Sequence, residues 1–264
     1  MVPGMSEQDV PGLKVSAGTG GVATLLIDRP AQRNALTLAM WAAIPGILAG
    51  LAADRSVRVL LLRGAGGTFS AGADISELHG IYSDPDRADE YHATNVRAEE
   101  ALAAFPHPTI AVVEGACVGG GCQLAVACDL RFAEPSARFG ITPAKLGVVY
   151  PAVPSARLAR LVGPARAKYL LFSAELVGAE HAERIGLADE VVPDVATRAE
   201  EFAALLASRS PQTLGAAKAI IDSPDPHATA REWERRSRTA PDVREGLSAF
   251  LERRAPRFHQ GDGA

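Results

Sequence analysis

The apolar positions in the first half of the chain fall into short runs separated by glycine-rich turns. Leu13–Ala17 and Val22–Asp28 flank the sequence GTGG, an arrangement that predicts a β-hairpin. Val57–Arg63 is apolar at nearly every position instead of at alternate ones, which is typical of a strand buried on both faces. Thr109–Val113 is a further β-like run. We therefore expect a sheet whose later strands lie inside the molecule.

Helical patterns separate these strands. Thr37 is suited to cap an alanine-rich helix that runs to about Ala53, because its hydroxyl can accept a hydrogen bond from a free N–H of the first turn. A short helix is expected to begin near Asp74, and Asp84–Ala104 has the composition of a charged helix. A short strand, Leu130–Ala133, follows later. Strands that alternate with helices are typical of the α/β class, which is the predicted fold class.

From Pro154 onward the pattern is almost entirely helical, apart from one extended piece at Leu187–Val192. This change is the only internal boundary that the pattern indicates. We therefore divide the chain into a disordered leader (residues 1–11), an α/β core (residues 12–195) and a C-terminal helical region (residues 196–264). The helices expected from Pro154 onward are Pro154–Leu161, Pro164–Phe172, Ala179–Ile185, Ala196–Ser208, Pro211–Ile221 and Thr229–Arg254.

The stretch Glu114–Asp129, EGACVGGGCQLAVACD, has a pattern typical of a binding corner. It follows Thr109–Val113 and passes through three glycines, Gly119–Gly121, into an expected helix, Cys122–Ala127. A helix that begins at glycines leaves backbone N–H groups free, with the positive end of the helix dipole behind them, so the corner favours a negative oxygen. The alternative is a tight turn that binds nothing. A second glycine-rich corner, GAGGTFSAGADI, follows the strand Val57–Arg63.

Composition and charge narrow the possible functions. A net charge of −4 without a basic stripe argues against nucleic-acid binding, which depends on neutralising phosphates. No apolar run approaches the ~18 residues that a membrane span needs, and no signal sequence is evident, so a cytoplasmic location is the simplest expectation. Cys117, Cys122 and Cys128 lack histidine partners and CxxC spacing, so they predict small core residues and no metal site.

Six ordered motifs resemble the crotonase superfamily of enoyl-CoA hydratases and isomerases. They are IDRPAQRNAL, TFSAGADISEL, EGACVGGGCQLAVACDLRFA, RFGITPAKLGV, SAELVGAEHAERIGLADEVVP and AFLERRAP, and they extend from about Val22 to Pro256. The resemblance implies a spiral of ββα units and a C-terminal helical region that builds homotrimers or dimers of trimers. It also implies an acyl-CoA thioester as substrate and no separate cofactor, because CoA is part of the substrate.

The resemblance implies a role for each of the two glycine-rich corners. In the family, two backbone N–H groups bind the thioester oxygen as an enolate forms, and here these belong to Ala73 and Gly120. Phe250 and Arg253 match positions that reach the adenine and phosphate end of CoA, commonly from an adjacent subunit; a core aromatic and a solvated charge are the alternatives. The remaining substrate or CoA-binding positions implied are Arg33, Ala35, Leu36, Ala71, Asp74, Ile75, Gly119 and Gln123.

The chain departs from the hydratases at two positions. A hydratase of this family uses one glutamate after the glycine corner and one in the next loop, whereas this chain has Gln123 and Pro143 there. An amide cannot exchange a proton at a useful pKa, and proline has no polar side chain. Decarboxylation or isomerisation is therefore favoured over hydration, and a catalytically weak acyl-CoA-binding protein is the alternative. Asp74, Glu77, His79 and Glu114 remain candidate proton carriers, His79 foremost.

The loop FGITPAKLGVVY resembles the methylmalonyl-CoA decarboxylase branch of the family. In that branch a threonine and a tyrosine line the acyl pocket, and the matching residues here are Thr142 and Tyr150. Tyr150 would orient the departing carboxylate or protonate the enolate, with Thr142 as a hydrogen-bond partner. The branch carries a histidine where this chain has Ala73 and a glutamate where it has Gln123, so the resemblance is incomplete.

Overall fold

The main sheet of the computed structural model, which describes residues 10–258, is mixed but mostly parallel. Its strand order is β1-β2-β3-β4-β6-β9, and every neighbouring pair is parallel except β1 and β2. These two strands form the predicted hairpin, which is confirmed. The leader predicted at residues 1–11 falls almost wholly outside the described residues. The strands are β1 (Leu13–Ala17), β2 (Val22–Ile27), β3 (Val59–Gly64), β4 (Thr109–Val113), β6 (Leu130–Ala133) and β9 (Glu190–Val191).

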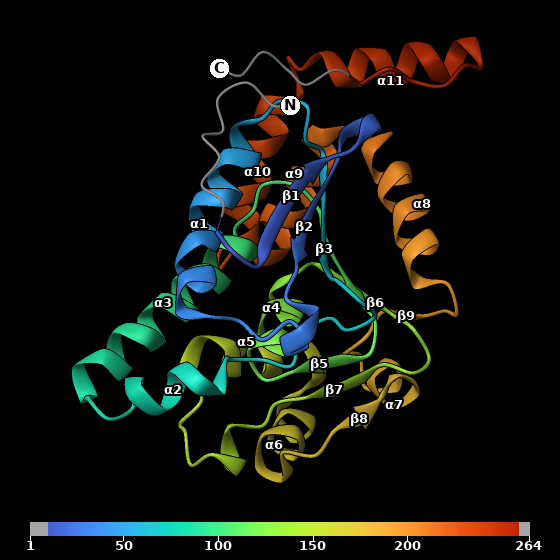
Figure 1. Ribbon diagram of the computed structural model, residues 1–264. Helices are drawn as coiled ribbons and strands as arrows, with labels where there is room; N and C mark the ends of the chain where they lie inside the picture. The colour runs from blue at the N-terminus through green and yellow to red at the C-terminus, as the bar shows by residue number, and fades with distance from the viewer. Residues whose placement is uncertain (1–9, 259–264) are drawn as a thin grey trace.

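Helices cover both faces of this sheet, as Figure 1 shows. The helices α1 (Leu38–Ala53) and α3 (Pro85–Ala103) pack on one face, and α8 (Val195–Ala207) packs on the other. Side chains of β3 accordingly alternate, since Leu60 faces the α1 side and Leu61 faces α8. The prediction that this strand is buried on both faces is confirmed.

A second, smaller sheet was not evident in the sequence pattern. It consists of β5 (Ala116–Val118), β7 (Arg138–Gly140) and β8 (Val177–Gly178), in the order β5-β7-β8. The strand β5, which lies between Thr109–Val113 and the glycines, was not predicted. The helix α4 (Gly120–Ala127) also begins earlier than expected, at Gly120.

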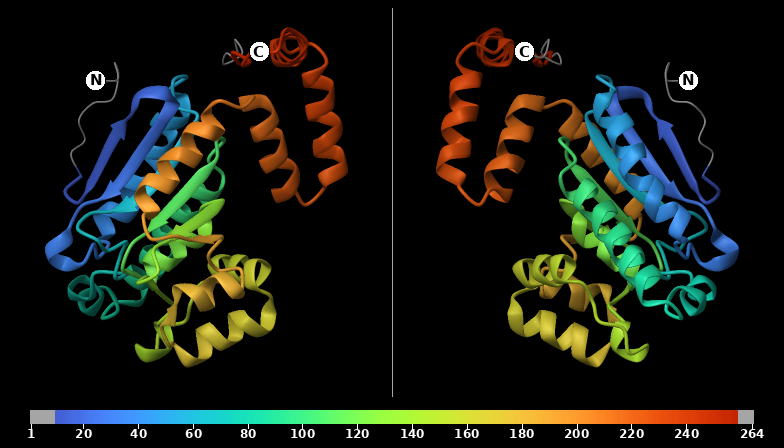
Figure 2. Two further views of the ribbon diagram at one scale, coloured as in Figure 1. Left: turned by 90° about the vertical axis from the view of Figure 1, so that its right-hand side faces the viewer. Right: turned by 90° about the vertical axis from the view of Figure 1, so that its left-hand side faces the viewer.

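The second half of the described chain is helical, as predicted, with one correction. The helix expected over Thr229–Arg254 is two helices, because Pro241 cannot continue a helix and instead begins the next one. Figure 2 shows the last three helices extending away from the sheet. The helices are α5 (Ala152–Val162), α6 (Pro164–Ser173), α7 (Ala179–Arg184), α9 (Pro211–Asp222), α10 (Pro226–Ser237) and α11 (Pro241–Glu252).

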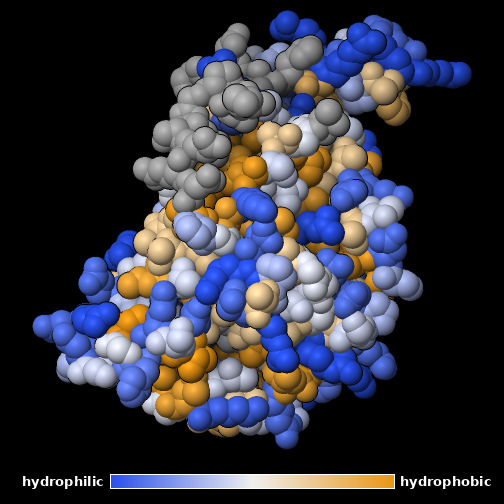
Figure 3. Space-filling view, in the orientation of Figure 1, coloured by the Kyte–Doolittle hydropathy of each residue, from blue (hydrophilic) through white to orange (hydrophobic). Residues whose placement is uncertain are grey.

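The short helix α2 (Ile75–Ile81) follows the glycine-rich corner GAGGTFSAGADI, as predicted. In Figure 3 apolar surface is visible at the lower end of the molecule, around this helix. Ile75 and Leu146 are exposed there, at 58% and 54%. Within residues 10–258, no helix combines the length and the apolar composition that crossing a membrane requires.

Candidate active site

Backbone hydrogen bonds bring the two glycine corners side by side. The N–H of Ser70 donates to the carbonyl of Ala116 (2.8 Å), and the N–H of Val118 donates to the carbonyl of Ser70 (2.9 Å). On its other side the same segment pairs with Leu36, whose N–H donates to the carbonyl of Gly72 (2.7 Å). The corner GAGGTFSAGADI is therefore held between residues 34–36 and β5, directly beside the corner of Gly119–Gly121.

The N–H groups of Ala73 and Gly120 lie close together in this arrangement. The N–H of Leu36 donates to the carbonyl of Gly72, and the carbonyl of Leu36 accepts from the N–H of Asp74. The N–H of Ala73, between these two residues, therefore points to the opposite side. A Cβ added to Gly120 would lie 3.7 Å from the nitrogen of Ala73, and one added to Gly72 would lie 3.3 Å from the nitrogen of Gly120. Gly120 is the first residue of α4, so its N–H has no acceptor within the helix.

Glycine is required at this corner by both conformation and space. Gly119 has a φ of 54°, which an L side chain rarely adopts. A Cβ on Gly120 would lie 2.7 Å from Cζ2 of Trp41, and a Cβ on Gly121 would lie 2.6 Å from Cβ of Ser70. The indole of Trp41 is fully buried, so it cannot move aside easily. The corner can present its backbone to a ligand only because these residues have no side chain.

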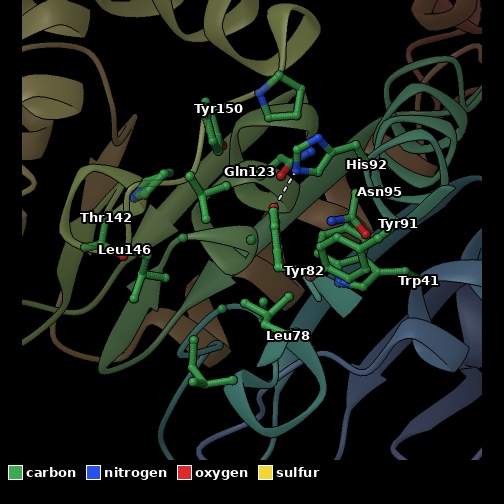
Figure 4. A pocket seen from close by; sticks show the side chains of 18 of the residues that line it. Trp41, Leu78, Tyr82, Tyr91, His92, Asn95, Gln123, Thr142, Leu146 and Tyr150 are labelled. Atoms are coloured by element: carbon green, nitrogen blue, oxygen red, sulfur yellow. Dashed lines mark hydrogen bonds between the residues drawn. The ribbon is translucent and has the colours of Figure 1, made fainter. Parts of the chain in front are cut away.

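A pocket of about 680 Å³, counting the part open to solvent, surrounds the paired N–H groups. Among residues 10–258 no aspartate or glutamate lines it, and its titratable side chains are Tyr82, Tyr91, His92 and Tyr150 (Figure 4). The rest of the lining is mostly apolar, with Asn95, Gln123 and Thr142 as its polar members. The apolar members and glycines are Trp41, Ala71, Gly72, Ala73, Ile75, Leu78, Gly119, Gly120, Pro143, Leu146, Val148 and Pro151.

Gln123 is held by a buried polar network. Its Nε2 donates to Oε2 of Glu99 at 3.0 Å, and Glu99, which is fully buried, forms an ion pair with Arg157. Because the amide nitrogen is engaged by Glu99, the amide oxygen is left as the atom that can accept a hydrogen bond in the pocket. Sequence analysis identified Gln123 but missed Glu99, since a lone glutamate in a charged helix carries no signal of burial.

Tyr150 and Thr142 come from the loop between β7 and α5, and both line the pocket. Burial raises the pKa of the Tyr150 phenol well above its ordinary value, and the nearby Cys122 and Cys117 thiols act in the same direction. Tyr150 therefore stays protonated at neutral pH and acts as a hydrogen-bond donor. Pro143 also lines the pocket and begins a short 3₁₀ turn.

The proton carriers considered from the sequence lie outside the pocket lining. The carboxylate of Asp74 caps α2 by accepting from the N–H of Ser76, and its other oxygen lies 2.9 Å from Nη1 of Arg29. Hydrogen bonds from Ser76 and then from Arg29 lower the pKa of Asp74. Glu77 accepts from the N–H of Leu38 (2.7 Å). His79 is exposed. The carboxylate of Glu114 lies 3.8 Å from the guanidinium group of an arginine. The histidine that does line the pocket is His92 of α3, which sequence analysis missed.

The predicted CoA-binding residues fall into three groups. Ala71, Ile75, Gly119 and Gln123 line the pocket. A second group lies behind it, where the N–H of Ala71 donates to the carbonyl of Arg33 (2.9 Å). The members of the second group are Arg33, Ala35, Leu36 and Asp74. The third group, Phe250 and Arg253, lies at the end of α11 and does not line the pocket of its own chain; Phe250 is 81% exposed.

Comparisons with known proteins agree with this fold and with the motifs. Residues 17–261 match the enoyl-CoA hydratase/isomerase family. The 2,3-dehydroadipyl-CoA hydratase of Escherichia coli K12 is 35% identical over 245 residues, which cover 90% of this chain and 94% of that protein. The chain therefore belongs to the enoyl-CoA hydratase/isomerase family.

Solved structures of relatives confirm the crotonase fold with its two sheets and C-terminal helices. An enoyl-CoA hydratase/isomerase family protein from Hyphomonas neptunium superimposes with a TM-score of 0.89 at 37% identity, covering 94% of this chain and 97% of that one. An enoyl-CoA hydratase from Bacillus anthracis gives a TM-score of 0.87 at 32% identity, covering 94% and 99%. The mixed α/β architecture predicted from the motifs is confirmed.

Proposed function

We propose that this protein converts an acyl-CoA thioester through an enolate, and that decarboxylation or double-bond isomerisation is favoured over hydration. One observation carries the proposal. The backbone nitrogens of Ala73 and Gly120 lie near each other, and both residues line a pocket whose described lining contains no carboxylate. The two N–H groups would bind the thioester oxygen as negative charge develops on it, and such donors are each worth about 10²–10³ in rate.

The composition of the pocket disfavours hydration. Adding water across a double bond needs one group that activates the water and one that moves a proton at the α-carbon. Gln123 and Pro143 occupy the two positions where a hydratase of this family carries glutamates, and neither exchanges protons. The Gln123 amide, with its nitrogen turned toward Glu99, offers an acceptor to the substrate but no base.

Decarboxylation suits the groups that are present. Loss of CO₂ from a malonyl-type thioester leaves its electron pair as the enolate, so no base is required. Tyr150, kept protonated by burial, can donate a hydrogen bond to the departing carboxylate or a proton to the enolate carbon, with Thr142 beside it. The likeness of this loop to the methylmalonyl-CoA decarboxylase branch supports this reaction, and Ala73 and Gln123 are the departures from it.

Replacing Tyr150 with phenylalanine is expected to lower the turnover of methylmalonyl-CoA at least about 10-fold, because the phenol is the donor nearest the reacting carboxylate in this proposal. Turnover is measured by mass from the loss of CO₂. Tyr169→Phe, at an exposed tyrosine that bonds Glu175, is the matched control and should leave turnover unchanged. Full turnover by the Tyr150 variant would remove Tyr150 from the mechanism.

A second candidate function is acyl-CoA binding without efficient catalysis. Its support is that the two proposed oxyanion donors are present, while Gln123 and Pro143, which exchange no protons, stand where the family resemblance places the hydratase glutamates. The two functions differ in one result: a binding protein would retain crotonyl-, 3-enoyl- and methylmalonyl-CoA on a column or in a titration and release each of them unchanged.

We also propose that the chain forms homotrimers, alone or paired as dimers of trimers. The C-terminal helices extend from the core, and α11 exposes the large apolar side chains Leu247, Phe250 and Leu251, at 63%, 81% and 81%. Exposed apolar side chains of this kind are typical of an interface. Light scattering should give three or six times the mass of 27.6 kDa, and a monomer at micromolar concentration would contradict the assembly.

A further inference from the structure

We propose that Tyr82 and His92 form the proton-transfer pair of this pocket. The proposal rests on the function proposed above and names the group that removes a proton from the acyl chain and returns it. Tyr82 lies at the end of α2, His92 lies on α3, and the phenol oxygen is 2.6 Å from Nε2 of the imidazole. Both residues line the pocket, and Figure 4 shows the Tyr82 hydroxyl directed at His92.

The position of α2 places the pair near the paired N–H groups. The helix begins two residues after Ala73 and has seven residues, so it is about 10 Å long. Tyr82 directly follows the helix and lines the same pocket as Ala73 and Gly120, in which an acyl chain attached to a bound thioester would lie.

The other titratable groups of the pocket are less suited to removing a proton from carbon. Burial raises the pKa of all three phenols, Tyr82, Tyr91 and Tyr150, so what distinguishes Tyr82 is its hydrogen bond to an imidazole. No hydrogen bond joins the phenol of Tyr91 or Tyr150 to an imidazole or carboxylate within the described chain. His92 is the one imidazole of the described lining, and imidazole is the side chain that gains and loses a proton most readily near neutral pH.

Few charged groups surround His92. The Tyr82 ring packs edge-on against it from α2, with ring centres 5.8 Å apart, and Tyr91 packs against it from its own helix at 6.2 Å. Glu77 of α2 lies near enough to influence Tyr91. Asn95 of α3, Gln123 of α4 and Tyr150 of the loop before α5 are further polar side chains of the described lining, and Figure 4 shows Asn95 beside His92.

The proposed step conserves protons and charge. With the imidazole proton on Nδ1, the proton of the α-carbon passes to the Tyr82 oxygen while the Tyr82 hydroxyl proton passes to Nε2 of His92. The C–H electron pair becomes the C=C bond of the enolate, and the thioester oxygen takes the negative charge between Ala73 and Gly120. The imidazolium then returns a proton through Tyr82, to the α-carbon or to the γ-carbon of an enoyl chain.

Deuterium exchange tests this step without requiring the natural substrate. Butyryl-CoA incubated in D₂O with the wild-type protein should gain deuterium at the α-carbon, measured by mass. Tyr82→Phe and His92→Asn should each slow the exchange at least about 10²-fold. The pH dependence of the wild-type exchange rate should be changed in His92→Asn, which a purely structural role would not explain.

Matched controls separate this role from misfolding. His79→Asn changes an exposed histidine of α2, and Tyr169→Phe an exposed tyrosine of α6; both should exchange at the wild-type rate. His92→Gln provides a second variant, and butyryl-CoA binding shows that each pocket is intact. Deuterium exchange at the wild-type rate in the His92 or Tyr82 variants would show that these residues are not the proton-transfer pair. Absence of exchange with the wild-type protein would also contradict the proposal. Turnover of methylmalonyl-CoA in the same samples reports the proposed function separately.

Discussion

Replacing Ala73 with proline is expected to lower kcat/KM for the thioester substrate by about 10²–10³, because proline has no N–H and removes one of the two donors to the enolate oxygen. The loss corresponds to about 2.7–4 kcal/mol of transition-state stabilisation. No hydrogen bond from the N–H of Ala73 to another residue of the described chain is found, so the change removes no internal hydrogen bond there. The measurement is steady-state turnover on whichever thioester the protein converts.

Ala73→Gly is the control for this prediction, because it keeps the N–H and adds no bulk to the pocket. It should retain activity within a few-fold of the wild type. Thermal unfolding of both variants shows whether the proline ring disturbs the fold near Gly72. If the proline variant is folded and fully active, the N–H of Ala73 does not stabilise the enolate, and the proposed oxyanion site is wrong.

Replacing Gln123 with glutamate is expected to destabilise the protein by about 3 kcal/mol. The change places a second carboxylate against the fully buried Glu99, where the present amide donates a hydrogen bond at 3.0 Å. Arg157 provides one positive charge for two negative ones. One carboxyl of the pair should therefore hold a proton at a higher pH than a free glutamate does, and the destabilisation should grow as pH rises through that titration.

The double variant Gln123→Glu with Glu99→Gln tests the physical reason. It exchanges the donor and the acceptor of the buried hydrogen bond and leaves one carboxylate in the network, so most of the lost stability should return. The free energy of unfolding, measured in urea for the wild type, both single variants and the double variant, gives the coupling. A double variant as unstable as the sum of the single variants would show that the two side chains do not interact.

The elements predicted most accurately are those with long apolar runs or clear caps. β3 and β4 were predicted from uninterrupted apolar sequence, and the start of α1 from Thr37, whose side chain accepts a hydrogen bond from the N–H of Met40. β5, β7 and β8 have only two or three residues each, too few for a periodic pattern. The break before Pro241 was readable in principle, since proline removes a helical hydrogen bond.

The site was predicted to different extents at its backbone and its side chains. The glycine corners carry a local signal because glycine is the residue that permits close approach of a ligand to the backbone. The contacts of Glu99 and His92 depend on how α3 packs against α4 and α2, which is information that spacing within one helix does not contain. His79 was named because it is a histidine that lies near the glycine corner in sequence, and His92 was not considered, although it is His92 that lines the pocket.

The central claim is that the protein makes an enolate in this pocket without the two hydratase glutamates. An equimolar mixture of crotonyl-, 3-enoyl- and methylmalonyl-CoA, incubated with the protein and followed by chromatography and mass, tests it most directly. We predict that methylmalonyl-CoA loses CO₂ or that the 3-enoyl thioester becomes its 2-enoyl isomer, while crotonyl-CoA remains unhydrated. Rapid addition of water to crotonyl-CoA, or recovery of all three thioesters unchanged, would contradict the claim.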